Sequence, residues 1–526
     1  MDEDDEEDEE TLKHLSWSNL TAFCERMFTT YLDKNDVKTK CAALRALTGI
    51  FIARPREMLR MDQSGLITNV MSPDAPSSVQ IESLRCWRDI LLTEEARIES
   101  GEAKSKMDSK KSITLSKKIS GDQDADATLF GGVLTNHAPR LFQMTQVRDK
   151  KIRYASLDLI GHLLRQGQVN PNETIPFLLA LQGDVEEDDI RSLALKLLMT
   201  EGEKRQDMLR QRVCAGVKQA YLFQKTAYPD LKEVSAQVTV KENGIMQTKC
   251  VFGAVFKEVI GNNRNQRQGL FRNLLSLFDL QNRKGRDAFS TEEEYLTVLP
   301  LLSFTSQVLA LLPYSFAGDP LYIIHYISSF LALQGADLLD RFAAFLRPYG
   351  LSSSDAMDEV NTEEDALEIA AKRKLPRRAK EARKLLGPDF DTKAFSNLCS
   401  EAGSLTLLLR LKAFLRKAYG LSESRCLGYN PEIKERVPEK TISKASLFAF
   451  DSKLPMQASY GGEDMTDVDR MIHQYAEFRQ LMRAETRVEV SIDDSDDEGL
   501  VRMNKKKRAL SEDEEDDDID DEMVEY

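Results

Sequence analysis

Apolar residues recur along most of this chain at intervals of three and four residues, the pattern of helices that bury one face. Segments with this spacing run for 12–22 residues and are broken by Pro, Gly or Asp. Alternation with period two is convincing only over residues 234–240, beside a turn signal at Asn243 and Gly244. The pattern therefore predicts an all-α fold of many medium-length helices in series. Two predicted apolar faces are Leu12, Leu15, Leu20, Phe23, Met27 and Phe28, and Leu270, Phe271, Leu274, Leu275 and Phe278.

A short motif repeats in the first 200 residues: an acid, a base four residues later, Leu after four more, and an aliphatic residue three further on. An acid and a base four residues apart share one helix face, so they can pair. The base of each copy, or Gln80 in the degenerate copy, is taken as its reference position. These positions are 40, 80, 153 and 191, so successive copies are 40, 73 and 38 residues apart. Spacings near 40 are typical of HEAT-repeat solenoids, in which each helical hairpin covers its neighbour's apolar face. The copies are Asp36/Lys40/Leu44/Leu47, a degenerate Gln80/Leu84/Trp87, Asp149/Arg153/Leu157/Ile160 and Glu187/Arg191/Leu195/Leu198.

Composition then divides the chain into helical blocks and polar segments. The polar segments have few apolar residues and many charges, so we predict that they are disordered. The fold expected is an all-α, curved HEAT-repeat α-solenoid with disordered acidic tails and internal charged linkers. The predicted segments are an acidic tail (1–10), HEAT-like repeats (11–98), a polar insert (99–126), the main solenoid (127–351), a charged linker with a basic cluster (352–388), a C-terminal helical segment (389–486) and an acidic tail (487–526).

The formal net charge of −15 arises from the two ends of the chain. Residues 2–10 are all acidic, and residues 512–525 contain eleven acids and no Lys or Arg. Without these twenty carboxylates the chain has 67 acidic and 72 basic residues. The body is therefore slightly basic, and the acidic balance does not exclude a nucleic-acid partner.

The sequence shows no signature of an enzyme. It contains no phosphate-binding loop, no dinucleotide fingerprint, no nucleophile elbow and no His or Cys cluster at zinc spacing. Its seven cysteines are scattered without a close pair, as in reduced intracellular proteins. Residues 295–318 carry no charge, but they include two prolines and several polar residues, so a buried helix is favoured over a membrane span. We therefore expect a non-enzymatic protein with no cofactor and no metal.

The segment from Gly261 to Asp279 combines a polar turn with a strongly amphipathic helix. Arg264 and Arg267 fall in the first helical turn, where the helix dipole disfavours cations. A negative partner would remove this penalty. The alternatives are an internal Asp or Glu, a DNA phosphate and an acidic protein surface. Arg264, Arg267 and, one turn on, Arg272 are therefore the candidate contacts with DNA or with an acidic protein partner.

Two basic clusters lie in the predicted polar segments. Such clusters act as solvated linkers, as nuclear import signals or as electrostatic DNA contacts, and the sequence leaves these open. The nuclear-localisation candidates are Lys372, Arg373, Lys374, Arg377, Arg378, Lys505, Lys506, Lys507 and Arg508.

Three blocks resemble the C-terminal region of the Nipped-B family of cohesin loaders, also called sister chromatid cohesion proteins or adherins. The blocks are IRYASLDLIGHLLRQGQVNPNETIPFLLAL (152–181), VIGNNRNQRQGLFRNLLSLFD (259–279) and LLPYSFAGDPLYIIHYI (311–327). A weaker similarity extends from about residue 12 to residue 482, in the same block order.

The resemblance implies a hook-shaped HEAT solenoid that binds double-stranded DNA and chromatin in the nucleus. It also implies contacts with the SMC ATPase heads and the kleisin of cohesin, stimulation of their ATPase, and ring loading for sister chromatid cohesion. Longer family members have an N-terminal region that binds a TPR-type partner subunit. That region has no counterpart here, so we expect an incomplete chain, a short form or half of a split loader. The alternative function is a generic HEAT-repeat nuclear adaptor that binds basic proteins through its acidic tails.

Overall fold

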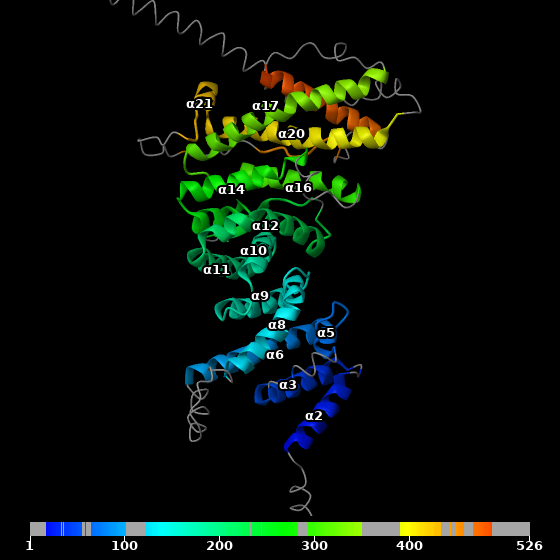
Figure 1. Cartoon of the computed structure of the whole chain (residues 1–526), viewed down its shortest axis with the longest axis vertical. Helices are drawn as coiled ribbons and strands as arrows, with labels where there is room; N and C mark the ends of the chain where they lie inside the picture. Colours follow the sequence, from blue (N-terminus) through cyan, green and yellow to red (C-terminus); the bar gives the residue numbers. More distant parts are fainter. Residues whose placement is uncertain are drawn as a thin grey trace, which may run out of the picture. The chain divides into compact units, whose positions relative to one another are not determined.

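A computed structural model describes most of the chain between residues 17 and 486 (Figure 1). The chain divides into two compact units, Met1–Gln266 and Arg267–Tyr526. Each unit is a set of packed helices, and the all-α prediction is confirmed. The sequence pattern did not predict a division at 266/267. The described residues are 17–32, 34, 36–54, 58, 65–100, 123–231, 233–242, 245–281, 292–349, 390–432, 442, 449–456 and 466–486.

In the first unit, helices pack on one another largely in chain order (Figure 1). α2 packs on α3, α3 on α6, α6 on α9 and α10 on α12, so neighbouring helices cover much of one another's apolar faces. The helices are α2 (Trp17–Leu32), α3 (Val37–Ala53), α5 (Leu66–Val70), α6 (Ser77–Ser100), α8 (Gln123–Met144), α9 (Lys150–Arg165), α10 (Pro171–Ala180), η1 (Leu181–Gly183), α11 (Asp188–Lys204), α12 (Gln206–Ala227), α13 (Gly253–Val255) and the π-helix η2 (Phe256–Ile260).

The repeated motif has a different structural role from the one expected. Asp36 and Asp149 are N-caps, which accept hydrogen bonds from backbone N–H groups of α3 and α9. Asp149 and Arg153, which the spacing allows to pair, do not do so: Arg153 pairs with Asp184 at 3.0 Å. The N-cap position turns the acid toward the helix N-terminus, while the base one turn later faces the interior.

In three copies, the polar side chain at the reference position donates hydrogen bonds to the turn that precedes the helix. Gln80 donates to the carbonyl of Ala75 at 2.8 Å. Arg153 donates to the carbonyls of Val147 and Arg148 at 2.9 and 2.7 Å. Arg191 likewise donates to the carbonyl of Asp184. In three copies of the motif, this side chain therefore donates to a backbone carbonyl of the turn before the helix.

A β-hairpin follows α12, at the place where the sequence alternates. β1 (Gln237–Glu242) pairs antiparallel with β2 (Ile245–Cys250), with Gln237 opposite Cys250. Val238 and Ala236 face the interior and are 5% and 0% exposed. The predicted strand is confirmed, shifted by a few residues toward the C-terminus.

The second unit is built on long helices. α17 and α16 both pack on α20, and α21 packs on α17. The five apolar residues predicted for 270–278 are all buried. The helices are α14 (Arg264–Ser276), which crosses the unit boundary, α16 (Glu292–Leu311), α17 (Gly318–Leu346), η3 (Arg347–Tyr349), α20 (Thr392–Tyr419), α21 (Glu423–Leu427) and a helix over residues 467–486.

Other expectations are corrected at particular places. Phe23 of α2 is 57% exposed, so the predicted apolar face over 12–28 is not buried as a whole. The predicted insert 99–126 is helical at both edges, because α6 ends at Ser100 and α8 begins at Gln123. The predicted tails 1–10 and 487–526 and the linker 352–388 lie outside the described residues.

None of the helices that the structure describes is long and apolar enough to cross a membrane. The uncharged stretch 295–318 falls largely in α16. Leu302, Phe304 and Thr305 of that helix are at most 1% exposed. The uncharged stretch is therefore a helix buried by its neighbours, as the sequence favoured.

Candidate functional site

A glycine and an asparagine shape the turn that precedes α14. Gly261 has φ 60° and ψ −148°, a region that is almost restricted to glycine. The side-chain oxygen of Asn263 accepts from the backbone N–H groups of Asn265 and Gln266 at 3.1 and 3.3 Å. The π-helix η2 comes directly before, and single π-turns are often found at functional positions. The turn therefore gives Arg264 a defined backbone position.

Arg267 lies inside the second unit. Its side chain is 2% exposed, and its Nε lies 3.0 Å from Oδ1 of Asp319. The guanidinium also lies 4.5 Å from the ring centroid of Phe316. Asp319 is in the first turn of α17, where an acid is favourable. The negative partner of Arg267 is thus internal, one of the alternatives that the sequence left open.

Arg264 and Arg272 are more accessible. Arg264 is half-buried and Arg272 is exposed. The Nε and Nη2 atoms of Arg272 donate to the hydroxyl of Tyr322 at 3.3 and 3.2 Å. This contact orients the guanidinium without neutralising its charge. Of the three candidate contacts, these two can reach a partner without unpacking the core.

The nine nuclear-localisation candidates in the clusters 372–378 and 505–508 lie outside the described residues. Among the residues that are described, no group of three or more His, Cys, Asp or Glu is arranged to hold a metal ion.

A second candidate site is a hollow of about 380 Å³ between α6, α9 and the start of α11, here named the α9 hollow. Leu84 and Ile190 form part of its apolar lining and are 1% and 2% exposed. Tyr154 of α9 also lines it and is 49% exposed. An exposed aromatic ring beside an apolar floor is a common feature of protein-binding surfaces.

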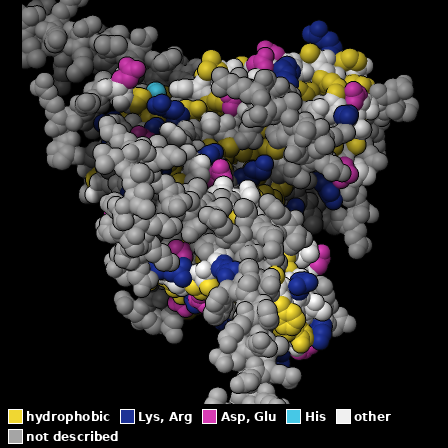
Figure 2. Space-filling model, turned by 60° about the horizontal axis from the view of Figure 1, so that its bottom comes forward, with side chains coloured by type: hydrophobic (Ala, Val, Ile, Leu, Met, Phe, Trp, Pro, Cys, Tyr) yellow, Lys and Arg dark blue, Asp and Glu magenta, His cyan; other side chains and the backbone are white. Residues whose placement is uncertain are grey.

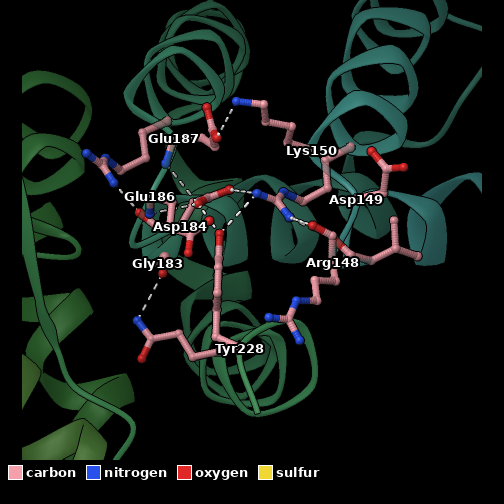
Figure 3. Close-up of polar contacts among 12 residues, drawn as sticks. Arg148, Asp149, Lys150, Gly183, Asp184, Glu186, Glu187 and Tyr228 are labelled. Atoms are coloured by element: carbon pink, nitrogen blue, oxygen red, sulfur yellow. Dashed lines mark hydrogen bonds and ion pairs between the residues drawn. The ribbon is translucent and has the colours of Figure 1, made fainter. Parts of the chain in front are cut away.

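Charged side chains of both signs surround the α9 hollow. Arg88 lies 3.5 Å from Asp158, and Lys150 lies 3.0 Å from Glu187. Figure 3 shows the second pair, in which Lys150 of α9 points to the carboxylate of Glu187 at the start of α11. Arg85, Lys151 and Asp189 complete the charged lining. The lining therefore contains four bases and three acids.

A buried polar network joins the helices around the hollow (Figure 3). The Asp184 carboxylate accepts from the backbone N–H groups of Glu186 and Glu187 and from the Tyr228 hydroxyl, and it pairs with Arg153. Burial, and then the bond to Asp184, raise the pKa of the Tyr228 hydroxyl well above its usual value. Tyr228 therefore stays protonated and remains a donor. The network fixes α9, α11 and α12 relative to one another.

Sequence reasoning missed the α9 hollow. Its lining comes from residues 81–88, 150–158 and 187–190, which meet only through helix packing. The repeat spacing indicates part of this lining, because Lys150 and Glu187 each stand at the start of a repeat helix. On the face shown in Figure 2, Lys and Arg side chains are interspersed with Asp and Glu. Among the side chains coloured in that view, no broad area carries charges of one sign only.

The helix packing within each unit shows the structural class: this is an α-helical repeat protein. A search of solved structures gives the same fold. The C-terminal fragment of the Chaetomium thermophilum cohesin loader SCC2 aligns with a TM-score of 0.56 and 12% identity. The alignment covers 90% of this chain and 28% of that one.

The sequence is similar to one family of known proteins. Residues 130–330 match the family model described as "Sister chromatid cohesion C-terminus". The chain is 23% identical over 500 residues to the Nipped-B-like protein of Mus musculus, which covers 91% of this chain. It is 25% identical over 317 residues to the human Nipped-B-like protein. These matches confirm the resemblance to the C-terminal region of the Nipped-B family. The chain spans only 17% of the mouse relative and 10% of the human one.

Proposed function

We propose that this chain is a non-enzymatic, chromatin-binding factor that promotes loading of cohesin for sister chromatid cohesion in the nucleus. In this role it contacts the SMC ATPase heads and the kleisin of cohesin and stimulates ATP hydrolysis by the heads. The observation that supports the proposal best is the alignment of 90% of the chain with a cohesin-loader fragment, together with the family match over 130–330.

Two arginines are the proposed contacts on α14. Arg272 is exposed and oriented by Tyr322, and Arg264 follows directly after the capped turn. A guanidinium binds phosphates and carboxylates through two parallel hydrogen bonds, so it suits both DNA and an acidic protein surface. Arg267 is left out of the proposal, because its guanidinium is buried against Asp319.

DNA binding is proposed to be independent of base sequence. The body is slightly basic, and a protein that neutralises phosphates releases counterions, so the affinity should fall steeply with salt. The acidic tails 1–10 and 491–526 should compete with DNA for the basic surface. A TPR-type partner subunit is a further proposed partner.

The test is a reconstituted assay of cohesin ATPase activity with and without DNA. We expect the full chain to stimulate hydrolysis. Arg264→Glu with Arg272→Glu should lower the DNA-dependent stimulation by roughly tenfold, for two lost charge-assisted contacts. The matched control is Arg425→Glu, an exposed arginine on a different helix, α21. Circular dichroism should show unchanged helicity in all variants.

Two outcomes would count against the proposal. The first is a stable full chain that neither binds the SMC heads in a nuclear pull-down nor stimulates them. Enrichment of basic proteins without SMC heads would favour the generic nuclear adaptor. The second is an equal loss of stimulation in the Arg425→Glu control, which would show that only net charge matters and would remove Arg264 and Arg272 as specific contacts.

A further inference from the structure

The β-hairpin of the first unit has two outer edges. β1 (Gln237–Glu242) and β2 (Ile245–Cys250) form a two-stranded sheet, so each strand pairs with the other along one edge only. The outer edge of a strand presents backbone N–H and C=O groups that can pair with another chain. Which residues present these groups follows from the register of the hairpin.

The register fixes which backbone groups point outward. Along an antiparallel pair, residues that exchange hydrogen bonds with the neighbouring strand alternate with residues whose N–H and C=O point away from it. Val251 donates from its backbone N–H to the carbonyl of Ala236 at 2.9 Å, which makes 236/251 a hydrogen-bonded pair. Counted along the register, Thr239 opposite Thr248 and residue 241 opposite Met246 are pairs of the other kind. The backbone groups of these residues therefore point away from the hairpin.

An independent contact agrees with this assignment. Arg191, in the first turn of α11, donates to the carbonyl of Thr239 at 3.3 Å, as expected if that carbonyl points away from β2. This bond also occupies part of the outer edge of β1. On the opposite edge, no hydrogen bond joins the backbone groups of Met246 and Thr248 to any residue in the described part of the chain. The outer edge of β2 thus offers two donors and two acceptors.

The side chains of β2 leave its outer edge accessible. Met246 is 64% exposed, and Gln247 and Thr248 are also exposed. Natural proteins commonly protect an edge strand with Lys or Pro. The stretch 246–248 contains neither, so it lacks this protection against pairing with a further strand.

We propose that two copies of this chain associate through the outer edges of β2, which pair antiparallel about a two-fold axis at Gln247. In this register, Met246 of one protomer lies opposite Thr248 of the partner subunit, and each such pair exchanges two hydrogen bonds. The outward N–H and C=O groups of both residues are then all bonded, in both protomers. The two hairpins become one four-stranded sheet, and a sheet of three or more strands is more stable than an isolated hairpin.

A second copy is the occupant because the edge is complementary to itself. The two outward residues lie symmetrically on either side of Gln247, so a two-fold axis brings donors onto acceptors. The side chains at 247 face each other across the axis, where two amides can hydrogen-bond. None of residues 246–248 is charged, so no like charges meet at these positions. One short strand contributes a small contact area, so we expect a reversible dimer.

The first experiment is sedimentation velocity of the full chain at increasing concentration. We expect a dimer fraction that rises between roughly 5 and 200 μM, as for a weak interface. Thr248→Pro removes an N–H that points outward and does not bond to β1, so the ladder of the hairpin is kept. The variant should weaken the dimer by at least about tenfold, because two symmetry-related hydrogen bonds are lost.

Thr239→Pro is the matched control. Thr239 lies directly opposite Thr248, is also exposed, and presents its N–H to the other edge of the hairpin. The two variants place the same ring in the same pair of residues, so thermal unfolding should be alike in both. Only Thr248→Pro should weaken the dimer.

A cysteine at the axis tests the register without any loss of hydrogen bonds. Gln247→Cys places two thiols in a pair whose Cα atoms lie roughly 4.5 Å apart, a separation that a disulfide can span. Mild oxidation should give a covalent dimer, and peptide mapping should find position 247 linked to position 247. Thr239→Cys, on the other edge, should form no more covalent dimer than the parent chain with its own seven cysteines.

The opposite results overturn the inference. A chain that stays monomeric up to about 200 μM does not pair through this edge. Dimerisation of Thr248→Pro as strong as that of the parent, or equal weakening by Thr239→Pro, would place the contact elsewhere. Failure of the Gln247→Cys protein to form the 247–247 disulfide would reject the two-fold register. None of these measurements uses DNA or cohesin, so the result is independent of the proposed loading function.

Discussion

The buried ion pair between Arg267 and Asp319 allows a quantitative test of whether Arg267 of α14 stabilises the fold or serves as a surface contact. We consider Arg267→Met, which keeps an unbranched side chain of similar length but removes the guanidinium. The variant leaves Asp319, which is 3% exposed, without the cation 3.0 Å away. It also removes the cation from the face of Phe316, 4.5 Å from the guanidinium. A buried carboxylate that loses its cation keeps the full cost of desolvation.

Removal of one partner of a buried ion pair costs about 3–5 kcal/mol. For a unit of this size, 1 kcal/mol lowers the melting temperature by about 2–4 °C. Arg267→Met should therefore melt roughly 6–20 °C below the parent protein. Replacement of both partners, Arg267→Met with Asp319→Asn, should recover most of the loss, because no buried charge is then left unpaired.

The assay is thermal unfolding followed by circular dichroism at 222 nm, with all variants at one protein concentration. Arg272→Met is the matched control: its side chain is exposed on the same helix and loses only the hydrogen bonds to Tyr322, so its stability should change by about 0.5–1.5 kcal/mol. If Arg267→Met melted within about 2 °C of the parent, the argument from burial would fail. Arg267 would then return to the set of surface contacts.

Two further predictions concern the interior. Tyr228→Phe removes the hydroxyl that donates to Asp184 at 2.5 Å. It should lower the free energy of unfolding in urea by about 1–3 kcal/mol. An unchanged urea midpoint would mean that water replaces the hydroxyl. Burial, with a smaller effect of Arg410, lowers the pKa of His473 to about 4 from 6.5. The unfolded chain therefore binds the proton first, and stability should fall by up to about 3 kcal/mol between pH 6.5 and pH 4. Burial raises the pKa of Glu477, which makes stability rise as the pH falls and so opposes the effect of His473. The contribution of His473 is therefore measured by comparison with His473→Gln, whose stability should fall less between pH 6.5 and pH 4. Equal dependence of stability on pH in the two proteins would refute the prediction.

The local features of this protein follow from the sequence alone. Apolar spacing located the helix over 270–278 and its buried face, because period 3.6 is a property of neighbouring residues. Alternation located the first strand of the hairpin for the same reason. The recurrence near 40 residues indicates stacked helical hairpins, and the three blocks at 152–181, 259–279 and 311–327 carry the resemblance to the Nipped-B family.

Only the tertiary structure decided which partner each charge has. Arg267 and Asp319 are 52 positions apart, and nothing in the spacing of α14 shows that its second arginine faces inward. Arg153 bonds to the preceding turn and to Asp184 instead of the acid four residues before it. The α9 hollow likewise exists only where three helices meet. Helical periodicity is encoded by nearest neighbours, whereas the burial and pairing of a charge depend on segments that folding brings together from distant parts of the chain.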